Sequence, residues 1–289
     1  MQKNRIQKIL SHIYAYSLED VLGLTSDNRR IAYYHVQKCG GSSINHVFYD
    51  LGYSTKIFKL ACKKKLISKT DPKRIDSSQR GYITNKVSYR INKPFIKNGG
   101  FVITRSPNIF RKGKANFIHG HYLPLDLLDR QDTFSFTTLR DPLSRLISRY
   151  KMDYAMYKEN KLSHYGDRVK ISGVVDKPEN YFQCLKESKR YKKEFYAILS
   201  TFSTNFELDE AKNNLKKVDY ILWQENLNKC FKKMIDKYSI SLMAYKKNLQ
   251  KVKNSSIKII EYPEISEGLK LSLKKSLSDE YKLISFLNK

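Results

Sequence analysis

A lysine and two glycines stand between an apolar run and a helical pattern, and this arrangement could bind a phosphate-like anion. Residues 31–36 are typical of a buried strand, and residues 43–48 of the first turns of a helix. Gly40 and Gly41 allow a tight turn that brings backbone N–H groups close to a ligand, and the helix start adds partial positive charge. Lys38 adds a full charge. Because it precedes both glycines, the loop differs from a nucleoside-triphosphate P-loop, in which the lysine follows the last glycine.

A second segment has the residues for another phosphate contact. Residues 132–139 are rich in β-branched and aromatic side chains and predict a strand. Pro142 suits the first helical position and Asp141 the cap before it, so a helix should begin there. Arg140 would then lie at the strand end and Ser148 about two turns into the helix, a spacing at which both can reach one phosphate.

The same segment can also be read as an ordinary capped amphipathic helix. In that interpretation Leu143, Leu146 and Ile147 face inward and the arginines are solvated. The two interpretations can hold together, because a packed helix can still present one polar face to a ligand.

A His-x-His pair, His119 and His121, ends another apolar run. Alternating side chains would put both imidazoles on one face of a strand. Such a pair could bind a metal, act in acid–base catalysis, or form buried hydrogen bonds. Metal binding is the weakest interpretation, since it needs further ligands and none of the other histidines or the four cysteines has ligand spacing. The other histidines are His12, His35, His46 and His164.

Composition indicates a folded protein with anionic partners. The chain has 289 residues, is 40% hydrophobic and carries a formal net charge of +27. This is long and apolar enough for a sizeable core. The charge could attract a nucleotide, an acidic glycan, nucleic acid or a lipid surface, although a lysine-rich composition could equally follow from the genome.

Cysteine spacing and hydropathy favour a cytoplasmic protein that could also lie at the surface of a membrane. The four cysteines are scattered singly, and no run approaches the ~18 apolar residues of a membrane span. Residues 1–30 predict an amphipathic helical extension and no signal peptide. Oligomeric state cannot be read from the sequence.

Strands that alternate with helices predict an α/β fold, a single domain over 1–289 whose central parallel sheet is flanked by helices. Residues 56–98 have no strong period and predict an insertion near the acceptor side. Ligand sites in such sheets lie at the carboxyl ends of the strands, where all three motifs fall. The strand candidates are 31–36, 101–104, 116–119, 133–139 and 218–223.

The two anion motifs together resemble sulfotransferases that use 3′-phosphoadenosine 5′-phosphosulfate (PAPS). In the carbohydrate branch the first loop usually reads H-I-P-K-T-G-G-T-S-[IFL], and this chain departs from it at Gln37, Cys39 and Ser42. The pattern R-D-P-x-x-R-x-x-S-x-Y resembles that family's 3′-phosphate segment. The resemblance implies a P-loop-like sulfotransferase fold and a donor site made by Lys38, Cys39, Gly40, Gly41, Ser42, Ser43, Ile44, Arg140 and Ser148.

The His-Gly-His segment is similar to that of uronosyl 2-O-sulfotransferases acting on heparan and dermatan chains. That likeness implies that His121 is the general base, that His119 supports it, and that Lys38 stabilises charge during transfer without a metal. We therefore expect an O-sulfotransferase that releases adenosine 3′,5′-bisphosphate and modifies a carbohydrate or glycoconjugate hydroxyl. Basic residues ahead of the histidines hint at an acidic acceptor, namely Arg105, Arg111, Lys112 and Lys114.

Two other classes of protein account for part of the sequence. A nucleic-acid-binding protein would explain the charge but not the motif spacing, and the chain lacks stacked-aromatic or groove-helix signatures. A small-molecule kinase with an irregular P-loop would need the lysine elsewhere and an acidic strand end for Mg²⁺.

Overall fold

The structure is a computed structural model, and it describes residues 27–41, 43–45, 48, 103–104, 107–113, 115–159, 173–189, 191–238 and 261–287. The predicted insertion at 56–98 lies outside these residues. So does most of the predicted N-terminal extension, whose last residue, Arg30, is already in the first strand.

The described elements alternate between strands and helices, as the sequence predicts. The strands are β1 (Arg30–Tyr34), β2 (Ile103–Thr104), β3 (Phe117–Gly120), β4 (Thr133–Leu139) and β5 (Tyr220–Trp223). The helices are α7 (Pro107–Arg111), α8 (Pro142–Lys158), α10 (Pro178–Glu187), α11 (Lys192–Phe195), α12 (Ala197–Phe202), α13 (Leu208–Lys216), α14 (Leu227–Lys237), α16 (Glu267–Ser276) and α17 (Ser278–Leu287), with 3₁₀ turns at Leu125–Asp129 and Gln224–Asn226.

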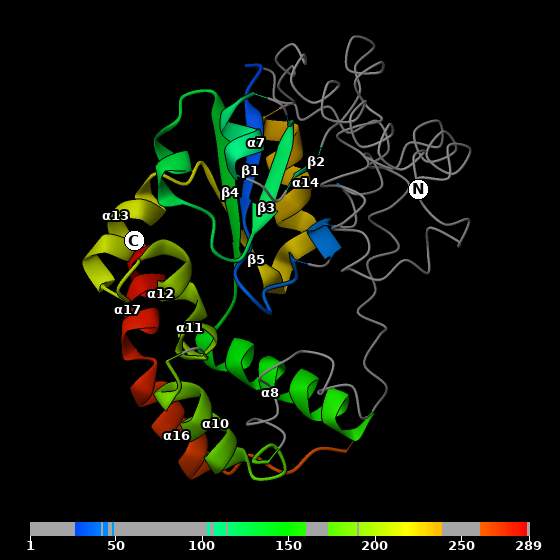
Figure 1. The fold of residues 1–289 in the computed structure, drawn as a ribbon, viewed down its shortest axis with the longest axis vertical. Coiled ribbons are helices and arrows are strands. Elements are labelled where there is room, and N and C mark those ends of the chain that lie inside the picture. Colours follow the sequence, from blue (N-terminus) through cyan, green and yellow to red (C-terminus); the bar gives the residue numbers. More distant parts are fainter. Residues whose placement is uncertain are drawn as a thin grey trace, which may run out of the picture. The chain divides into compact units, whose positions relative to one another are not determined.

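The strands form one sheet in the order β2-β3-β1-β4-β5 (Figure 1). β1 pairs with β3 in parallel, with Tyr33 opposite His119 and Tyr34 opposite Gly120. β2 pairs with the other edge of β3, also in parallel. The order is non-sequential because parallel neighbours need crossover connections. The prediction of an α/β fold with a central parallel sheet flanked by helices is confirmed.

The chain divides into two compact units. The described part of the first unit includes β1, β2, β3, the first half of β4, α7 and α14, and that of the second includes the loop 35–41, α8, α10 to α13, β5, α16 and α17. The core of the first unit is aromatic. Phe48 stacks on Phe117 with ring centroids 4.0 Å apart, and Tyr33 stacks on Phe136 at 4.5 Å. These rings are fully buried, and such stacked contacts add to the free energy gained from burying apolar area.

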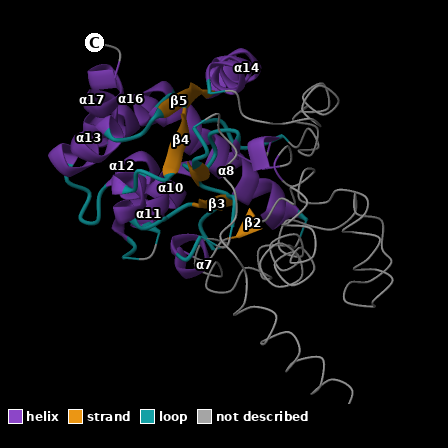
Figure 2. Ribbon diagram, turned by 90° about the horizontal axis from the view of Figure 1, so that it is seen from above, coloured by secondary structure: helices purple, strands orange, loops and turns teal. Residues whose placement is uncertain are grey.

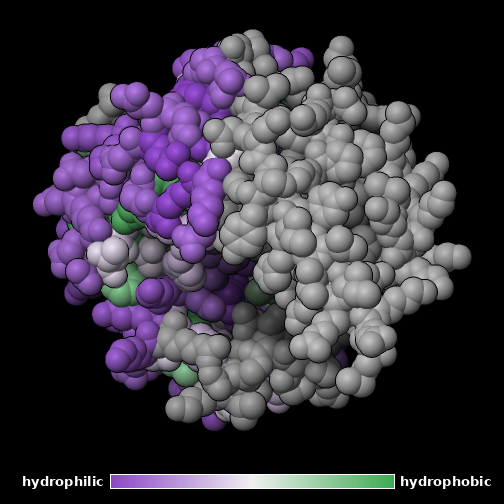
Figure 3. Space-filling model, turned by 45° about the horizontal axis from the view of Figure 1, so that its top comes forward, coloured by the Kyte–Doolittle hydropathy of each residue, from purple (hydrophilic) through white to green (hydrophobic). Residues whose placement is uncertain are grey.

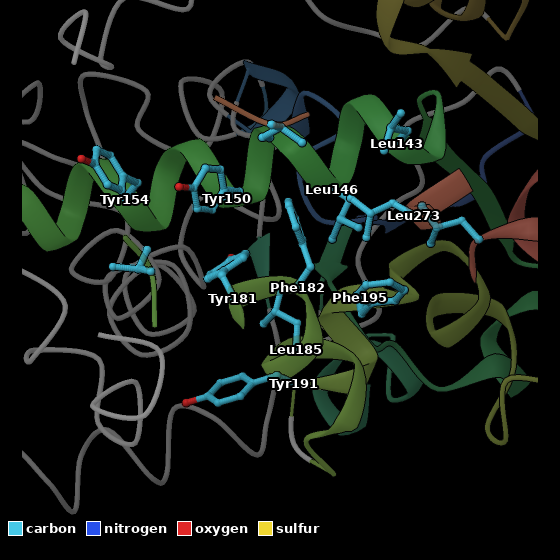
Figure 4. Packing of buried hydrophobic residues seen from close by; sticks show 13 residues of the cluster. Leu143, Leu146, Tyr150, Tyr154, Tyr181, Phe182, Leu185, Tyr191, Phe195 and Leu273 are labelled. Carbon is cyan, nitrogen blue, oxygen red and sulfur yellow. The ribbon is translucent and has the colours of Figure 1, made fainter. Parts of the chain in front are cut away.

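The second unit is mainly helical, and α8 is its longest described helix. α8 begins as predicted, because Asp141 caps it by accepting a hydrogen bond from the Ser144 backbone N–H at 2.7 Å, and Pro142 takes the first turn. In Figure 4 the side of α8 that carries Leu146 and Tyr150 faces aromatic residues of α10. The helices α10 to α13 pack in chain order, and α17 contacts α12 and α13 (Figures 1 and 2).

A buried ion pair joins α17 to α8 in the same unit. Arg145 and Glu280 are both fully buried, with Nη2 and Oε2 3.5 Å apart. Arg145 also donates to the backbone carbonyls of Glu194 and Phe195, and Glu280 accepts from the backbone N–H groups of Ile198 and Leu199. Charges buried this way need such partners, so removing either Arg145 or Glu280 would leave the other uncompensated.

One face of the described part of the molecule is mostly polar. In Figure 3 the coloured face is mostly hydrophilic, with only scattered hydrophobic residues. Among the described residues, no helix combines the length and apolar character that crossing a bilayer requires.

Candidate functional site

The loop that carries Lys38 leaves β1 and turns in the left-handed region twice. Lys38 has φ 64° and Gly40 has φ 81°. Glycine adopts such angles freely, whereas a residue with a Cβ does so at a cost that the surroundings must offset. The chain becomes helical at Gly41, and Ser43, Ile44 and Asn45 are also helical, so the predicted strand–turn–helix is confirmed. Ser42 lies outside the described residues.

The second glycine of the loop is required by a neighbouring ring. A Cβ added at Gly41 would overlap the imidazole of His35, so His35 packs directly on the helix start. A Cβ at Gly40 would lie 3.0 Å from Cδ2 of Leu227, a contact tighter than most. The two glycines therefore serve the packing of the loop.

Cys39 points into the protein. Its side chain is fully buried, and Sγ lies 3.7 Å from the backbone carbonyl oxygen of Gln37, to which it donates. Burial raises the pKa of the Cys39 thiol to about 12, so it stays protonated at neutral pH. Any contact of Cys39 with a phosphate would therefore use its backbone N–H.

The three arginines of the second motif have different surroundings. Arg145 is paired with Glu280, and Arg149 pairs with Asp153 and Glu194. Both arginines are buried, so the expectation that they are solvated is wrong. Each has acidic partners on other turns or elements that compensate its burial. Arg140 is half-buried, and no described carboxylate forms an ion pair with it.

Ser148, the second predicted phosphate contact, is half-buried on α8. Asp141, next to Arg140, has a structural role. It caps α8 and accepts a hydrogen bond from the Tyr281 hydroxyl at 2.9 Å. Burial opposes ionisation of Asp141, but the hydrogen bonds from Ser144 and Tyr281 outweigh it and lower the pKa.

Lys38 reaches α8 within the second unit. Its Nζ lies 3.4 Å from Sδ of Met152, a weak acceptor that does not neutralise the charge. Burial lowers the pKa of Lys38, Arg149 and Arg140 lower it further, and Asp153 and Cys39 oppose them. Lys38 and Arg140 are therefore close enough to repel each other, and no carboxylate in the described part of the chain bonds to either. Such an arrangement favours a bound anion.

The histidines belong to the first unit. His119 is buried in β3, and its ring lies 5.7 Å from that of Phe117 on the same face. His121 follows the end of β3, is partly exposed, and has Tyr122 as its ring neighbour at 6.3 Å. His119 therefore has the surroundings of a core residue, whereas His121 is accessible to a substrate.

Part of the basic charge ahead of the histidines is neutralised. Arg111 makes two hydrogen bonds to the carboxylate of Asp126, at 2.8 and 3.0 Å. The Arg111 guanidinium lowers the pKa of Asp126, which stays ionised. Arg105 and Lys114 lie outside the described residues, and Lys112 is exposed.

A separate hollow in the second unit contains none of the predicted site residues. Helices α13, α16 and α17 form it, and three lysines give it a basic lining. The residues that line it are Lys212, Lys274, Ser278, Tyr281, Lys282, Ser285 and Phe286. Tyr281 connects this hollow to the segment that contains Arg140, because its hydroxyl donates a hydrogen bond to the Asp141 carboxylate.

The sequence patterns did not predict the group of residues around Arg149. Arg149 Nη1 donates to Oε1 of Gln37 at 3.0 Å, and Arg149 Nε donates to Oδ2 of Asp153 at 2.8 Å. The i, i+4 spacing of Arg149 and Asp153 signals a helical ion pair. No signal in the sequence connects Arg149 with Gln37, 112 residues earlier.

These features define an α/β protein with a glycine-containing loop after its first strand and, before a capped helix, an arginine that forms no ion pair with a described carboxylate. A model of the sulfotransferase family matches residues 23–282, which is most of the chain. The chain therefore belongs to the sulfotransferase family. No curated protein matches it. Among the described residues, no group of three histidine, cysteine, aspartate or glutamate side chains could hold a metal ion.

Proposed function

We propose that this sulfotransferase uses PAPS as its donor and transfers the sulfuryl group to a hydroxyl of a carbohydrate or glycoconjugate. The observation that carries the proposal is the pair of cations in the second unit. Lys38 and Arg140 are both partly buried, the Arg140 charge contributes to lowering the pKa of Lys38, and neither residue forms an ion pair with a described carboxylate. A donor with phosphate groups at both ends would compensate both charges.

The residues present fit such a donor. Arg140 and Ser148 would hold the 3′-phosphate, the arginine through charge-assisted hydrogen bonds. Lys38, Gly40, Gly41 and the serines 42 and 43 would hold the 5′ end, with the helix start directing its N–H groups at the charge. When bound, the donor supplies the activated sulfuryl group. Nothing in this chemistry calls for a metal.

Within that arrangement the protein would move one proton and stabilise one developing charge. The acceptor hydroxyl attacks sulfur in line with the bridging oxygen, and positioning dominates such transfers. The His121 imidazole would accept the hydroxyl proton. The Lys38 ammonium would stabilise the negative charge that develops on the bridging oxygen as its bond to sulfur breaks. His119 would support His121 from within β3.

The first test is binding of adenosine 3′,5′-bisphosphate and of AMP, measured by calorimetry. The bisphosphate should bind far more tightly, because only it engages Arg140. Each hydrogen bond to the charged group should contribute ~1.5–3 kcal/mol, so Arg140→Ala should lose most of the preference. Arg130→Ala is the matched control, since it also removes a half-buried guanidinium but lies outside the motif. Equal affinity of the native protein for the two nucleotides would contradict the proposal.

A further inference from the structure

The Lys38 loop is held by a side chain from far along the chain. Lys38 adopts a left-handed backbone angle, which the surrounding contacts must maintain. The residue before it, Gln37, accepts a hydrogen bond from Nη1 of Arg149 at 3.0 Å. The residue after it, Cys39, is buried and donates to the carbonyl of the same Gln37. Gln37 is thus bonded through both its side chain and its backbone.

Arg149 is itself held in place by several partners. Its Nε donates to Oδ2 of Asp153 at 2.8 Å, and the Tyr181 hydroxyl donates to the same oxygen at 2.8 Å. Its Nη2 lies 2.5 Å from Oε2 of Glu194. Burial opposes the charge of the guanidinium, but the acidic neighbours outweigh burial and hold the pKa of Arg149 above its ordinary value. A guanidinium fixed in this way is a rigid anchor for whatever its remaining nitrogen contacts.

Arg149 also acts on the charge of Lys38. After burial, Arg149 is the strongest influence that lowers the pKa of Lys38, ahead of Arg140 and against Asp153 and Cys39. The Asp153 carboxylate is bonded to Arg149 and to the Tyr181 hydroxyl, so much of its charge is already balanced. The Lys38 ammonium lies beside the Met152 thioether and forms no ion pair with a described carboxylate.

We propose that Arg149, acting through Gln37, is a positioning residue that holds Lys38 in the geometry needed for sulfuryl transfer. This inference rests on the proposed function. It also accounts for a departure from the family loop, where proline usually stands at the position of Gln37. A proline ring restricts the backbone by itself. Here the hydrogen bond from Arg149, which lies outside the loop, restricts the backbone at Gln37 instead.

The decisive variants change Gln37, because replacing buried Arg149 would leave Asp153 and Glu194 uncompensated and could prevent folding. Gln37→Ala removes the acceptor, and Gln37→Glu keeps one. Gln37→Ala should lower kcat by about 10- to 100-fold, the range that one lost hydrogen bond to a charged group represents. Gln37→Glu should restore most of kcat. A role in global stability alone would instead lower the melting temperature and leave kcat per folded molecule unchanged.

Tyr181→Phe is the matched control for the network. It removes one hydrogen bond to Asp153 and leaves the bond between Arg149 and Gln37 in place. Its effect on kcat should be at least several-fold smaller than that of Gln37→Ala. If Gln37→Ala and Gln37→Glu lower kcat equally, or if Tyr181→Phe lowers it as much as Gln37→Ala, the proposal is wrong.

Hydrogen exchange separates this proposal from the proposed function. The backbone N–H groups of residues 38–41 should exchange faster in Gln37→Ala than in the native protein, with no nucleotide or acceptor present. Unchanged exchange would overturn the positioning role even if the enzyme transfers sulfate. Faster exchange in a protein that fails to prefer the bisphosphate would support the positioning role and contradict the proposed function.

Discussion

The Lys38 loop and the His119–His121 segment both follow strands of the sheet, but different interactions hold them. The histidine segment is set by main-chain pairing, since β3 pairs with β1 and β2 and places His119 opposite Tyr33. The Lys38 loop depends on side chains, namely the Gln37–Arg149 hydrogen bond, the buried Cys39 and the packing of His35 on Gly41.

This difference predicts where each region is sensitive to mutation. Many small contributions stabilise a pair of strands. A single side-chain change beside such a pair should therefore alter the chemistry of the site more than the position of its backbone. A loop held by a few buried contacts loses its geometry when one of them is removed. Substitutions in the histidine segment should therefore affect turnover, and substitutions in the loop should affect donor binding and stability as well.

The largest effect should come from His121→Ala. If His121 accepts the proton of the acceptor hydroxyl, turnover should fall by ~10²- to 10⁴-fold, while affinity for adenosine 3′,5′-bisphosphate stays unchanged. The acid limb of the native rate profile should follow a group titrating near neutrality, as an imidazole does, and should vanish in the variant. Normal turnover of the variant with the correct acceptor would show that another group takes the proton.

Gly41→Ala should have a smaller effect, expressed in both stability and binding. The new methyl group would overlap the His35 ring, and overpacking of this kind costs roughly 1–3 kcal/mol. Urea unfolding would measure the loss, and calorimetry should show weaker bisphosphate binding. Gly268→Ala is the control, because nothing lies within 4 Å of its added Cβ. On helix α16 that change should stabilise the protein by up to about 1 kcal/mol. Equal stability of the two variants would contradict the packing role of Gly41.

The smallest effect should be the pH dependence of donor binding that arises from Lys38. A lysine is cationic below its pKa, and burial together with Arg149 lowers the pKa of Lys38, so its charge is lost at lower pH than in an exposed lysine. Bisphosphate affinity should therefore weaken by up to about tenfold per pH unit above that pKa.

The matched variant for this pH dependence is Lys38→Arg, because a guanidinium stays charged throughout the accessible range. Its bisphosphate affinity should be flat where that of the native protein falls. The control is Lys193→Arg, at an exposed position of α11. It should leave the pH dependence of bisphosphate affinity as it is in the native protein. A native affinity that does not change with alkaline pH would show that the Lys38 charge does not contribute to binding.

Local patterns were sufficient for much of the fold. All five predicted strands are present, with ends displaced by a few residues, because short buried runs between turn signals have few alternatives. The start of α8 is also as predicted, since a cap and a proline act within one turn. The family followed from two short motifs whose order and spacing the sequence displays, and the family model confirms it.

Apart from the local Arg149–Asp153 pair, the tertiary structure alone decided which partners the arginines have. Arg140, Arg145 and Arg149 have the same residue type within one segment, yet only Arg140 lacks a carboxylate partner among the described residues. The partners Glu194 and Glu280 come from helices that follow much later in the chain. Burial and long-range pairing depend on how helices pack, and no local pattern encodes that packing. For the same reason the sequence predicted a lysine in an anion-binding loop, but only the folded chain joined that loop to Arg149.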